Sequence, residues 1–255
     1  MASVRQLTAA YADILITPHR GPAVCVECFN LTRGYGYCYA CGARPRVLDT
    51  VVPISYSIAH EPLHEALAGY KRGTGVAAGR HVVELAGILW RFLAAHERCV
   101  ARAAGVARFP LVTTVPSSDP GRDASHPLRR IVRELVGPTS SRHRRLLTPS
   151  TAGRPPRTFD AQRFEPLLTL AGEPVLLIDD TWTTGASAQS AGAALRRAGA
   201  GPVAAVVIGR HVNREWHEND ARLRALAGRF DWGACALCAR SATTSGGRDP
   251  GARAA

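Results

Sequence analysis

Two adjacent acids and a run of small or hydroxyl-bearing residues form the stretch of this sequence best equipped for chemistry. Asp179 and Asp180 follow the apolar run 175–178. Carboxylates at the end of a buried strand are costly unless they bind something. The residues that follow are Thr181, Thr183, Thr184, Gly185, Ala186 and Ser187. Because such residues can surround an anion with hydroxyl and backbone N–H groups at the start of a helix, the stretch predicts a phosphate-binding loop.

Two other interpretations compete with this one. The acids could merely cap the next helix, with Thr183 or Thr184 as its N-cap. A lone acid pair would favour that interpretation, but the complete string favours anion binding. A nucleotide P-loop would require G-x-x-x-x-G-K-[ST], a pattern the sequence lacks, and its single lysine, Lys71, lies far from the loop.

Paired cysteines near the N-terminus predict a metal site. Cys25, Cys28, Cys38 and Cys41 form two C-x-x-C pairs in a short stretch rich in glycine and tyrosine. In a chain without an export signal, such pairs indicate metal ligands before disulfides. Four thiolates are the number that tetrahedral structural zinc takes, so we expect one structural Zn²⁺ held by these residues.

The other cysteines leave alternatives open. Cys235 and Cys238 form a third C-x-x-C pair, which could cap the zinc module in space, replace one of its knuckles, or form a labile dithiol. Cys99 stands in a helical apolar pattern and is expected to be a buried core thiol. The nine histidines show no H-x-x-H or H-E-x-x-H pattern, so none is assigned to a metal or to catalysis.

The elements that position the loop follow from hydrophobic periodicity. Strands are predicted at residues 51–58 and 111–115, and buried strands at residues 175–178 and 203–208. Helices are predicted at residues 64–70, 80–104, 127–135 and 188–198. Strands that alternate with helices at this spacing form βαβ units, so the fold class is α/β with a parallel sheet flanked by helices. The loop then falls at the carboxyl end of a parallel strand, where open sheets usually bind ligands.

Residues 137–164 are basic and rich in proline and glycine, which predicts a long mobile loop. Among the residues that make it basic are Arg142, His143, Arg144, Arg145, Arg154 and Arg157. They could form a lid that closes over a polyphosphate, or simply a solvated charge run. The tail after Arg240 is poor in apolar residues and is predicted to be disordered.

The charge balance favours an anionic partner. The chain carries a formal net charge of +12, and nearly all its positive charge is arginine. An excess of this size suits a polyphosphate substrate or a nucleic acid. No apolar run approaches the roughly 18 residues of a membrane span, and no export signal is evident, so we expect a cytoplasmic protein. The texture of the sequence divides it into a cysteine module at 1–48, an α/β domain at 49–232, and a C-terminal segment at 233–255.

The acid pair and the Thr-Thr-Gly-Ala-Ser string resemble the phosphoribosyl pyrophosphate motif of type I phosphoribosyltransferases. The N-terminal cysteine module, Tyr70-Lys71-Arg72-Gly73 and a strand ending at Pro116 extend the resemblance to the ComF family of competence-associated proteins. The resemblance spans residues 12–210. It implies a type I phosphoribosyltransferase-like sheet with a zinc-ribbon-like module at its N-terminus.

The resemblance also implies roles for individual residues. Asp179 and Asp180 would bind the ribose hydroxyls of phosphoribosyl pyrophosphate with Mg²⁺, as the residues closest to catalysis. The string from Thr181 to Ser187 would hold the 5-phosphate. Lys71 and Arg122 would face the pyrophosphate, although ComF proteins usually carry a richer His-Arg loop where Arg122 stands.

Two functions are compatible with these features. The first is transfer of the phosphoribosyl group to a nitrogen nucleophile, such as a nucleobase or an amine, with departure of pyrophosphate. Positioned acids, Mg²⁺ and basic groups suffice for that reaction, without a covalent side-chain nucleophile. The alternative is a non-catalytic protein of the DNA-uptake type that binds nucleic acid and retains a phosphate pocket.

Overall fold

A four-stranded parallel sheet forms the centre of the computed structural model, which describes residues 3–72, 75–117, 119–151, 155 and 157–239. Its strands are β1 (Thr50–Ile58), β2 (Leu111–Thr114), β5 (Val175–Trp182) and β6 (Val203–Val212). Their order is β1-β6-β5-β2, and each neighbouring pair is parallel. A parallel bridge between Val112 and His143 adds one more contact beside β2. The predicted α/β class with a parallel sheet is confirmed.

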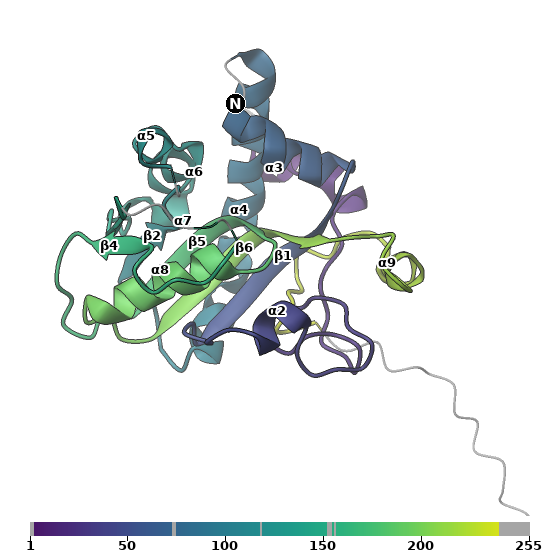
Figure 1. Cartoon of the computed structure of the whole chain (residues 1–255). Helices are drawn as coiled ribbons and strands as arrows, with labels where there is room; N and C mark the ends of the chain where they lie inside the picture. The colour runs from purple at the N-terminus through teal and green to yellow at the C-terminus, as the bar shows by residue number, and fades with distance from the viewer. Residues whose placement is uncertain (1–2, 73–74, 118, 152–154, 156, 240–255) are drawn as a thin grey trace, which may run out of the picture.

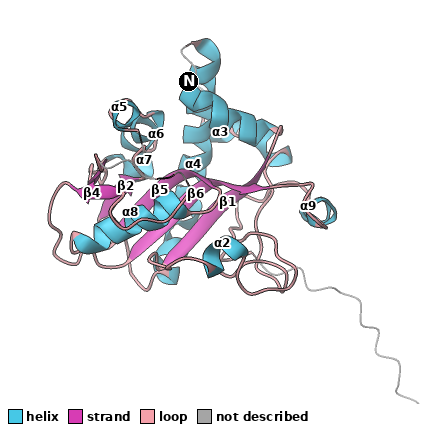
Figure 2. Ribbon diagram, in the orientation of Figure 1, coloured by secondary structure: helices cyan, strands magenta, loops and turns pink. Residues whose placement is uncertain are grey.

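Helices cover both faces of this sheet (Figure 2). The main ones are α3 (Pro62–Arg72), α4 (Val76–Ala103) and α8 (Ala186–Arg197). Alternating residues of β5 enter two separate cores: Leu176 and Ile178 pack with α3 and α4, whereas Val175 and Leu177 pack with α8. Because successive side chains of a strand point to opposite faces, a strand buried on both faces reads as a continuous apolar run.

The longest helix, α4, has the apolar spacing that the sequence predicts. Leu85, Leu89 and Phe92 are buried on the face that meets the sheet. The helix ends at Ala103, and Gly105 follows with a φ of 72°, the left-handed conformation that commonly terminates helices. It begins at Val76, four residues before the predicted start at residue 80.

The remaining elements are short. They are α1 (Val4–Leu7), η1 (Ala10–Asp13), α2 (Tyr39–Gly42), α5 (Pro120–Asp123), α6 (Pro127–Arg130), η2 (Ile131–Leu135), α7 (Gly137–Ser140), β3 (Leu147–Pro149), β4 (Phe164–Pro166) and α9 (Asn219–Leu226). The expectation of one irregular loop over 137–164 is wrong in part. Strands β3 and β4 pair antiparallel, and α7 precedes them, because buried Leu146, Leu147 and Phe164 anchor this segment to the α8 core.

The N-terminal cysteine module lies on the same face of the sheet as α8. Cys25, Cys28, Cys38 and Cys41 are buried, and they share a core with Val51 of β1 and with Ala188 of α8. The module is therefore joined to the sheet by common packing. Within the described part of the chain, no helix is long and apolar enough to cross a membrane. The tail that the sequence predicts to be disordered lies outside the described residues.

Candidate functional site

The acid pair lies inside strand β5, and not after its end as the apolar run suggested. Strand β5 continues to Trp182, and Thr181 still pairs with Gly209 of β6. The loop proper consists of Thr183 and Thr184, followed by Gly185. Strand β5 therefore carries the acids to the carboxyl edge of the sheet, between its neighbours β6 and β2.

Asp180 is buried and has two polar partners from helix α3. The Tyr70 hydroxyl donates a hydrogen bond to Asp180 Oδ2, and Lys71 Nζ lies 2.5 Å from the same oxygen. Asp180 is only 4% exposed, so a cation at this distance offsets much of the cost of burying its charge. The last turn of α3 thus brings Lys71, predicted from the sequence to serve the same ligand, onto the acid pair.

Asp179 is in a different electrostatic state. Its Oδ1 accepts the backbone N–H of Asp180 at 2.9 Å. Burial raises the pKa of Asp179 to about 7, and the adjacent charge of Asp180 adds to this, whereas Lys71 opposes it. Since the unfolded value is 3.8, the stability that the protonated form contributes is fully present below about pH 4 and is lost as pH rises through about 7. A hydroxyl donor or a cation beside Asp179 would stabilise its ionised form.

Gly185 shapes the turn between the strand and the helix. Its φ is 79°, in the left-handed region that favours glycine. A Cβ atom there would overlap the Trp182 indole ring and lie 2.8 Å from Arg44 Nη2. Trp182 is buried beneath this turn, with Arg44 stacked 5.3 Å from its ring centroid. The indole is therefore part of the scaffold of the loop and does not face solvent.

Helix α8 opens directly behind the turn. Its N-cap is Gly185, which has no side chain to bind the first N–H groups. The hydroxyl of Thr184 accepts from the backbone N–H of Ala186 at 3.3 Å. Thr183 is exposed and Ser187 is half-buried, both beside this helix start. The first N–H groups of a helix carry a partial positive charge, so the arrangement can hold an anion.

The loop after β2 lies at the same edge of the sheet because β2 pairs in parallel with β5. Arg122 is on this loop, but its side chain is 80% exposed and pairs with Asp119, 2.8 Å away. Asp123 of the same loop is buried and binds Arg129 and Arg145 at 2.7 and 2.9 Å. The loop is thus organised by its own ion pairs, and Arg122 is the predicted ligand residue that the structure does not bring onto the acid pair.

The basic segment is tied down at several places. Arg142 binds both carboxylate oxygens of Glu97, at 2.6 and 2.8 Å. Arg145 binds Asp123, and the carbonyl of Arg157 accepts from the Thr184 hydroxyl at 3.3 Å. Arg142 and Arg145 therefore have structural partners, while Arg157 lies against the candidate loop. Arg154, which also belongs to the predicted lid, lies outside the described residues.

The four N-terminal cysteines are arranged as metal ligands. Their four Sγ atoms all lie within 4.8 Å of one another, and none of the four cysteines forms a disulfide. The Sγ atoms of Cys28 and Cys38 are 3.7 Å apart. A tetrahedron with Zn–S bonds of about 2.3 Å has edges of about 3.8 Å, so this spacing fits such a site. The cysteine group could hold a metal such as zinc.

Two arginines connect this group with the candidate loop. Arg44 donates to Cys41 Sγ at 3.3 Å and to the carbonyl of Thr184. Arg210, at the end of β6, donates to Cys28 Sγ at 3.6 Å and to the carbonyl of Trp182 at 3.0 Å. Four thiolates around Zn²⁺ leave a net charge of −2, and the two guanidinium groups place positive charge beside it, although Arg44 also lies 3.5 Å from Glu27. The contacts thus favour a thiolate–metal cluster and also fix the backbone of the loop.

Sequence reasoning missed several residues near the acid pair. Tyr70 was noted only as part of a family pattern, and His126 was not assigned. The His126 ring lies 6.2 Å from the Tyr70 ring, edge to face, and burial lowers the pKa of this histidine. Neither Arg44 nor Arg210 stood out among the many arginines, because the loop carbonyls that they bind, those of Thr184 and Trp182, are distant in sequence.

The third C-x-x-C pair does not join the N-terminal module. Cys235 and Cys238 instead form a second group with His96 and Cys99 of helix α4, and the ligand atoms of all four lie within 4.8 Å of one another. Two of the alternatives left open, capping the module or replacing its knuckle, are therefore wrong. Cys99 is only half-buried, so it is not the enclosed core thiol that its pattern suggested. This group also could hold a metal.

No protein-family model, no curated protein and no solved structure matches this chain.

Proposed function

We propose that residues 179–187 bind the ribose 5-phosphate part of phosphoribosyl pyrophosphate, in a type I phosphoribosyltransferase-like protein of the ComF kind. One observation carries the proposal. The acid pair lies near the carboxyl end of the central parallel strand β5, the Gly185 turn and the start of helix α8 follow after Trp182, and helix α3 places Lys71 Nζ 2.5 Å from Asp180. These are the groups that a ribose, a phosphate and a pyrophosphate require, at the edge where parallel sheets bind ligands.

Each part of the ligand would meet a suited group. The 5-phosphate would bind the N–H groups at the start of α8, with the hydroxyls of Thr183 and Ser187 as further donors. The ribose hydroxyls would donate to Asp179 and Asp180. The pKa of Asp179, raised to about 7 mainly by burial, supports this role, because bound hydroxyls stabilise an ionised carboxylate.

The acid pair also fits Mg²⁺, which usually takes one or two carboxylates together with substrate phosphates. Bound there, the ion would supply charge neutralisation for the pyrophosphate group. The chain's own contributions are to position the ribose on the acids and to place Lys71 beside them. The reaction class that these groups serve is displacement of pyrophosphate from ribose C1 by a nitrogen nucleophile.

The position of Arg122 indicates a slow displacement of pyrophosphate. A departing pyrophosphate needs several cations, and Arg122 is exposed and paired with Asp119. We therefore expect the chain to bind phosphoribosyl pyrophosphate and to turn it over slowly with common nucleobases.

Calorimetry with phosphoribosyl pyrophosphate and Mg²⁺ tests the proposal. The parent should bind, and the combined change Asp180→Asn and Thr184→Ala should weaken binding at least a hundredfold, because it removes a charge and a hydroxyl from opposite ends of the site. Glu134→Gln changes an exposed acid that pairs with Arg130 on its own helical segment, and it should leave binding intact. Equal affinity in the parent and the double variant would refute the site.

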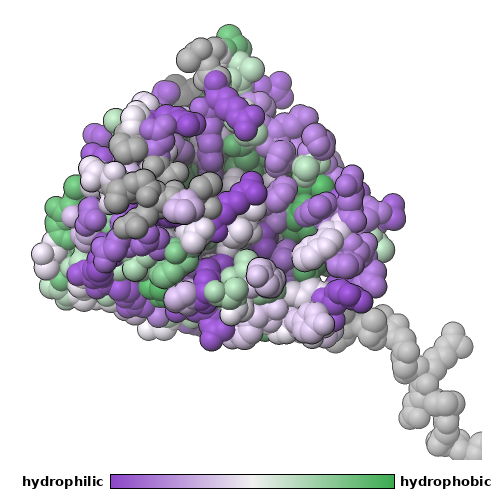
Figure 3. All heavy atoms as spheres, viewed as in Figure 1, coloured by the Kyte–Doolittle hydropathy of each residue, from purple (hydrophilic) through white to green (hydrophobic). Residues whose placement is uncertain are grey.

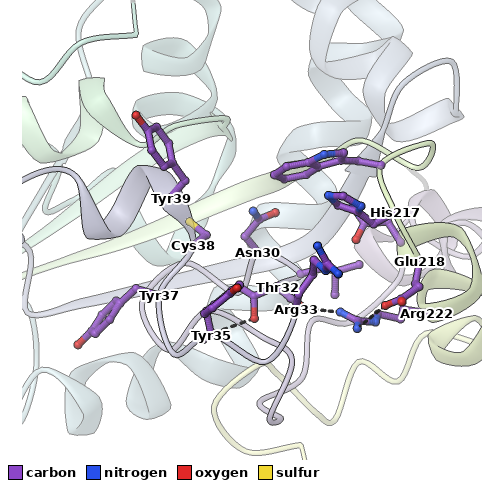
Figure 4. A pocket seen from close by; sticks show the side chains of 13 residues that line it. Asn30, Thr32, Arg33, Tyr35, Tyr37, Cys38, Tyr39, His217, Glu218 and Arg222 are labelled. Atoms are coloured by element: carbon purple, nitrogen blue, oxygen red, sulfur yellow. Dashed lines mark hydrogen bonds and ion pairs between the residues drawn. The ribbon is translucent and has the colours of Figure 1, made fainter.

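A second candidate function, nucleic-acid binding, is favoured by one surface. A cavity of about 170 Å³ lies between the cysteine module and the segment that leads into α9 (Figure 4). Around it are exposed aromatic residues: Tyr35 (68% exposed), Tyr37, Tyr39 (89% exposed) and Trp216. Arg33 and Arg222 line the same cavity. Aromatic faces next to arginines are the usual means by which proteins stack and hold single-stranded nucleic acid.

Fluorescence anisotropy with a short single-stranded DNA tests this second candidate. Affinity should fall steeply between low and physiological salt, because phosphate contacts release counterions. The combined change Tyr35→Ala and Trp216→Ala should weaken binding about tenfold or more through lost stacking. The variant with Asp180→Asn and Thr184→Ala should bind DNA as the parent does. Binding that is insensitive to salt, or lost only in that acid-site variant, would contradict the candidate.

A further inference from the structure

Helix α4 presents a histidine and a cysteine one turn apart at its C-terminal half. His96 and Cys99 stand at positions i and i+3, which share one face of a helix. The segment after α9 returns to this face and places Cys235 and Cys238 against it. Segments distant in the chain thus bring three thiols and one imidazole together. The metal chemistry of such a set is that of a structural zinc site.

The spacing of the ligand atoms supports a tetrahedral centre. The Sγ atoms of Cys235 and Cys238 are 3.4 Å apart, and His96 Nδ1 lies 3.8 Å from Cys238 Sγ and 4.0 Å from Cys99 Sγ. Zinc bonds of about 2.3 Å to sulfur and about 2.0 Å to nitrogen require edges of about 3.8 and 3.6 Å. Small side-chain adjustments would therefore bring all four atoms into coordination.

The second nitrogen of His96 fixes the state of the ring. His96 Nε2 lies 3.0 Å from the carbonyl oxygen of Trp232. A carbonyl can only accept, so Nε2 carries the proton and Nδ1 directs its lone pair toward the thiols. Metal-binding histidines commonly donate their other N–H to a carbonyl in this way, which orients the ring and makes the ligand more basic.

We propose that His96, Cys99, Cys235 and Cys238 bind a second zinc ion, which fastens the C-terminal part of the described chain to helix α4. No helix or strand occurs between α9 and Ala239 in the described residues, so this segment depends on side-chain contacts. Arg91 stacks 4.3 Å from the Trp232 ring centroid, and the N–H of Phe230 donates to Ala12 at 2.6 Å. Phe230 and Ala236 are buried in the core beside α4, and a metal cross-link would fix the rest of the segment next to them.

A labile Cys235–Cys238 dithiol accounts for fewer of these contacts than a zinc site does. It would use Cys235 and Cys238 alone, whose Sγ atoms are 3.4 Å apart. It would also leave unexplained why His96 and Cys99 converge on the same point with the His96 ring held by Trp232.

Elemental analysis of the reduced, full-length chain tests the proposal. We expect two zinc ions per chain. His96→Gln and Cys238→Ser should each lose one and keep the other. His81→Gln, on the same helix but outside the cluster, is the matched control and should keep both. A parent with one zinc, whose content is unchanged by His96→Gln, would overturn the proposal.

A measurement on the unaltered chain guards against variants that fail to fold. Bound zinc should protect Cys99, Cys235 and Cys238 together from alkylation, and a chelator should expose all three, as mass spectrometry of the labelled peptides would show. Fast labelling of Cys99 without chelator, or a Cys235–Cys238 disulfide in the freshly purified protein, would contradict the second site.

Discussion

Loss of the metal from the N-terminal cysteine group should abolish ribose-phosphate binding as well as unfold the module. Metal in small zinc modules contributes about 10–16 kcal/mol, as much as the entire stability of a typical domain. The combined change Cys38→Ser and Cys41→Ser should therefore lower the free energy of unfolding by about 5 kcal/mol or more. Denaturant unfolding measures this loss, and calorimetry measures ligand affinity on the fraction that stays folded.

The effect on the ligand follows from two arginines. Arg44 and Arg210 each join a cysteine sulfur to a carbonyl of the loop. Without the thiolates both arginines lose their sulfur partners, and although Glu27 still lies 3.5 Å from Arg44, the loop loses part of its support. Arg44→Ala distinguishes the support of the loop from metal binding. It should weaken ligand affinity about tenfold while the zinc content stays the same.

Arg20→Ala is the matched control for Arg44→Ala. Arg20 belongs to the same module, donates to the carbonyl of Val26 at 3.2 Å and makes no contact with the loop in the described structure. It should leave ligand affinity unchanged. Full ligand affinity in a metal-free variant would show that the module and the loop are independent.

Gly185→Ala should be strongly destabilising and should remove ligand binding. A left-handed φ costs a residue with a Cβ about 1–2 kcal/mol, and forced overpacking adds about 1–3 kcal/mol. The new methyl group would overlap the buried Trp182 ring and press on Arg44. We expect the free energy of unfolding to fall by about 3–4 kcal/mol, measured by chemical denaturation.

Gly105→Ala separates the two costs. Gly105 has a φ of 72°, close to that of Gly185, but a Cβ there would meet no atom within 4 Å. Its replacement should cost only about 1–2 kcal/mol, the conformational part. If both variants lose the same stability, the close packing of Trp182 against the turn does not contribute.

The sheet was predictable because its strands are short apolar runs, buried on both faces, between amphipathic helices. The extent of β5 was not, since acidic residues normally end a buried strand. Asp180 remains in the sheet because Tyr70 and Lys71 satisfy it, and those partners come from a distant helix. The four-cysteine group was visible because its ligands are close in sequence.

Other parts of the site depend on long-range packing. The His-x-x-Cys spacing of His96 and Cys99 on a helix is compatible with metal binding. Only the fold, however, brings these residues to Cys235 and Cys238. The basic segment was predicted to be a mobile loop because its charge indicated exposure to solvent. Instead, Arg142 and Arg145 form ion pairs with Glu97 and Asp123. On the face drawn in Figure 3, hydrophilic residues are spread broadly rather than gathered in one patch.

The supports of the candidate loop end on carbonyl oxygens. Arg44 reaches the carbonyl of Thr184, and Arg210 reaches that of Trp182. Every amino acid carries this oxygen, so replacing the side chain at position 184 leaves the supporting bond in place. The backbone of the loop and its ligand preference can therefore evolve separately, and an engineer could vary residues 183, 184 and 187 to alter the ligand without redesigning the frame that holds them.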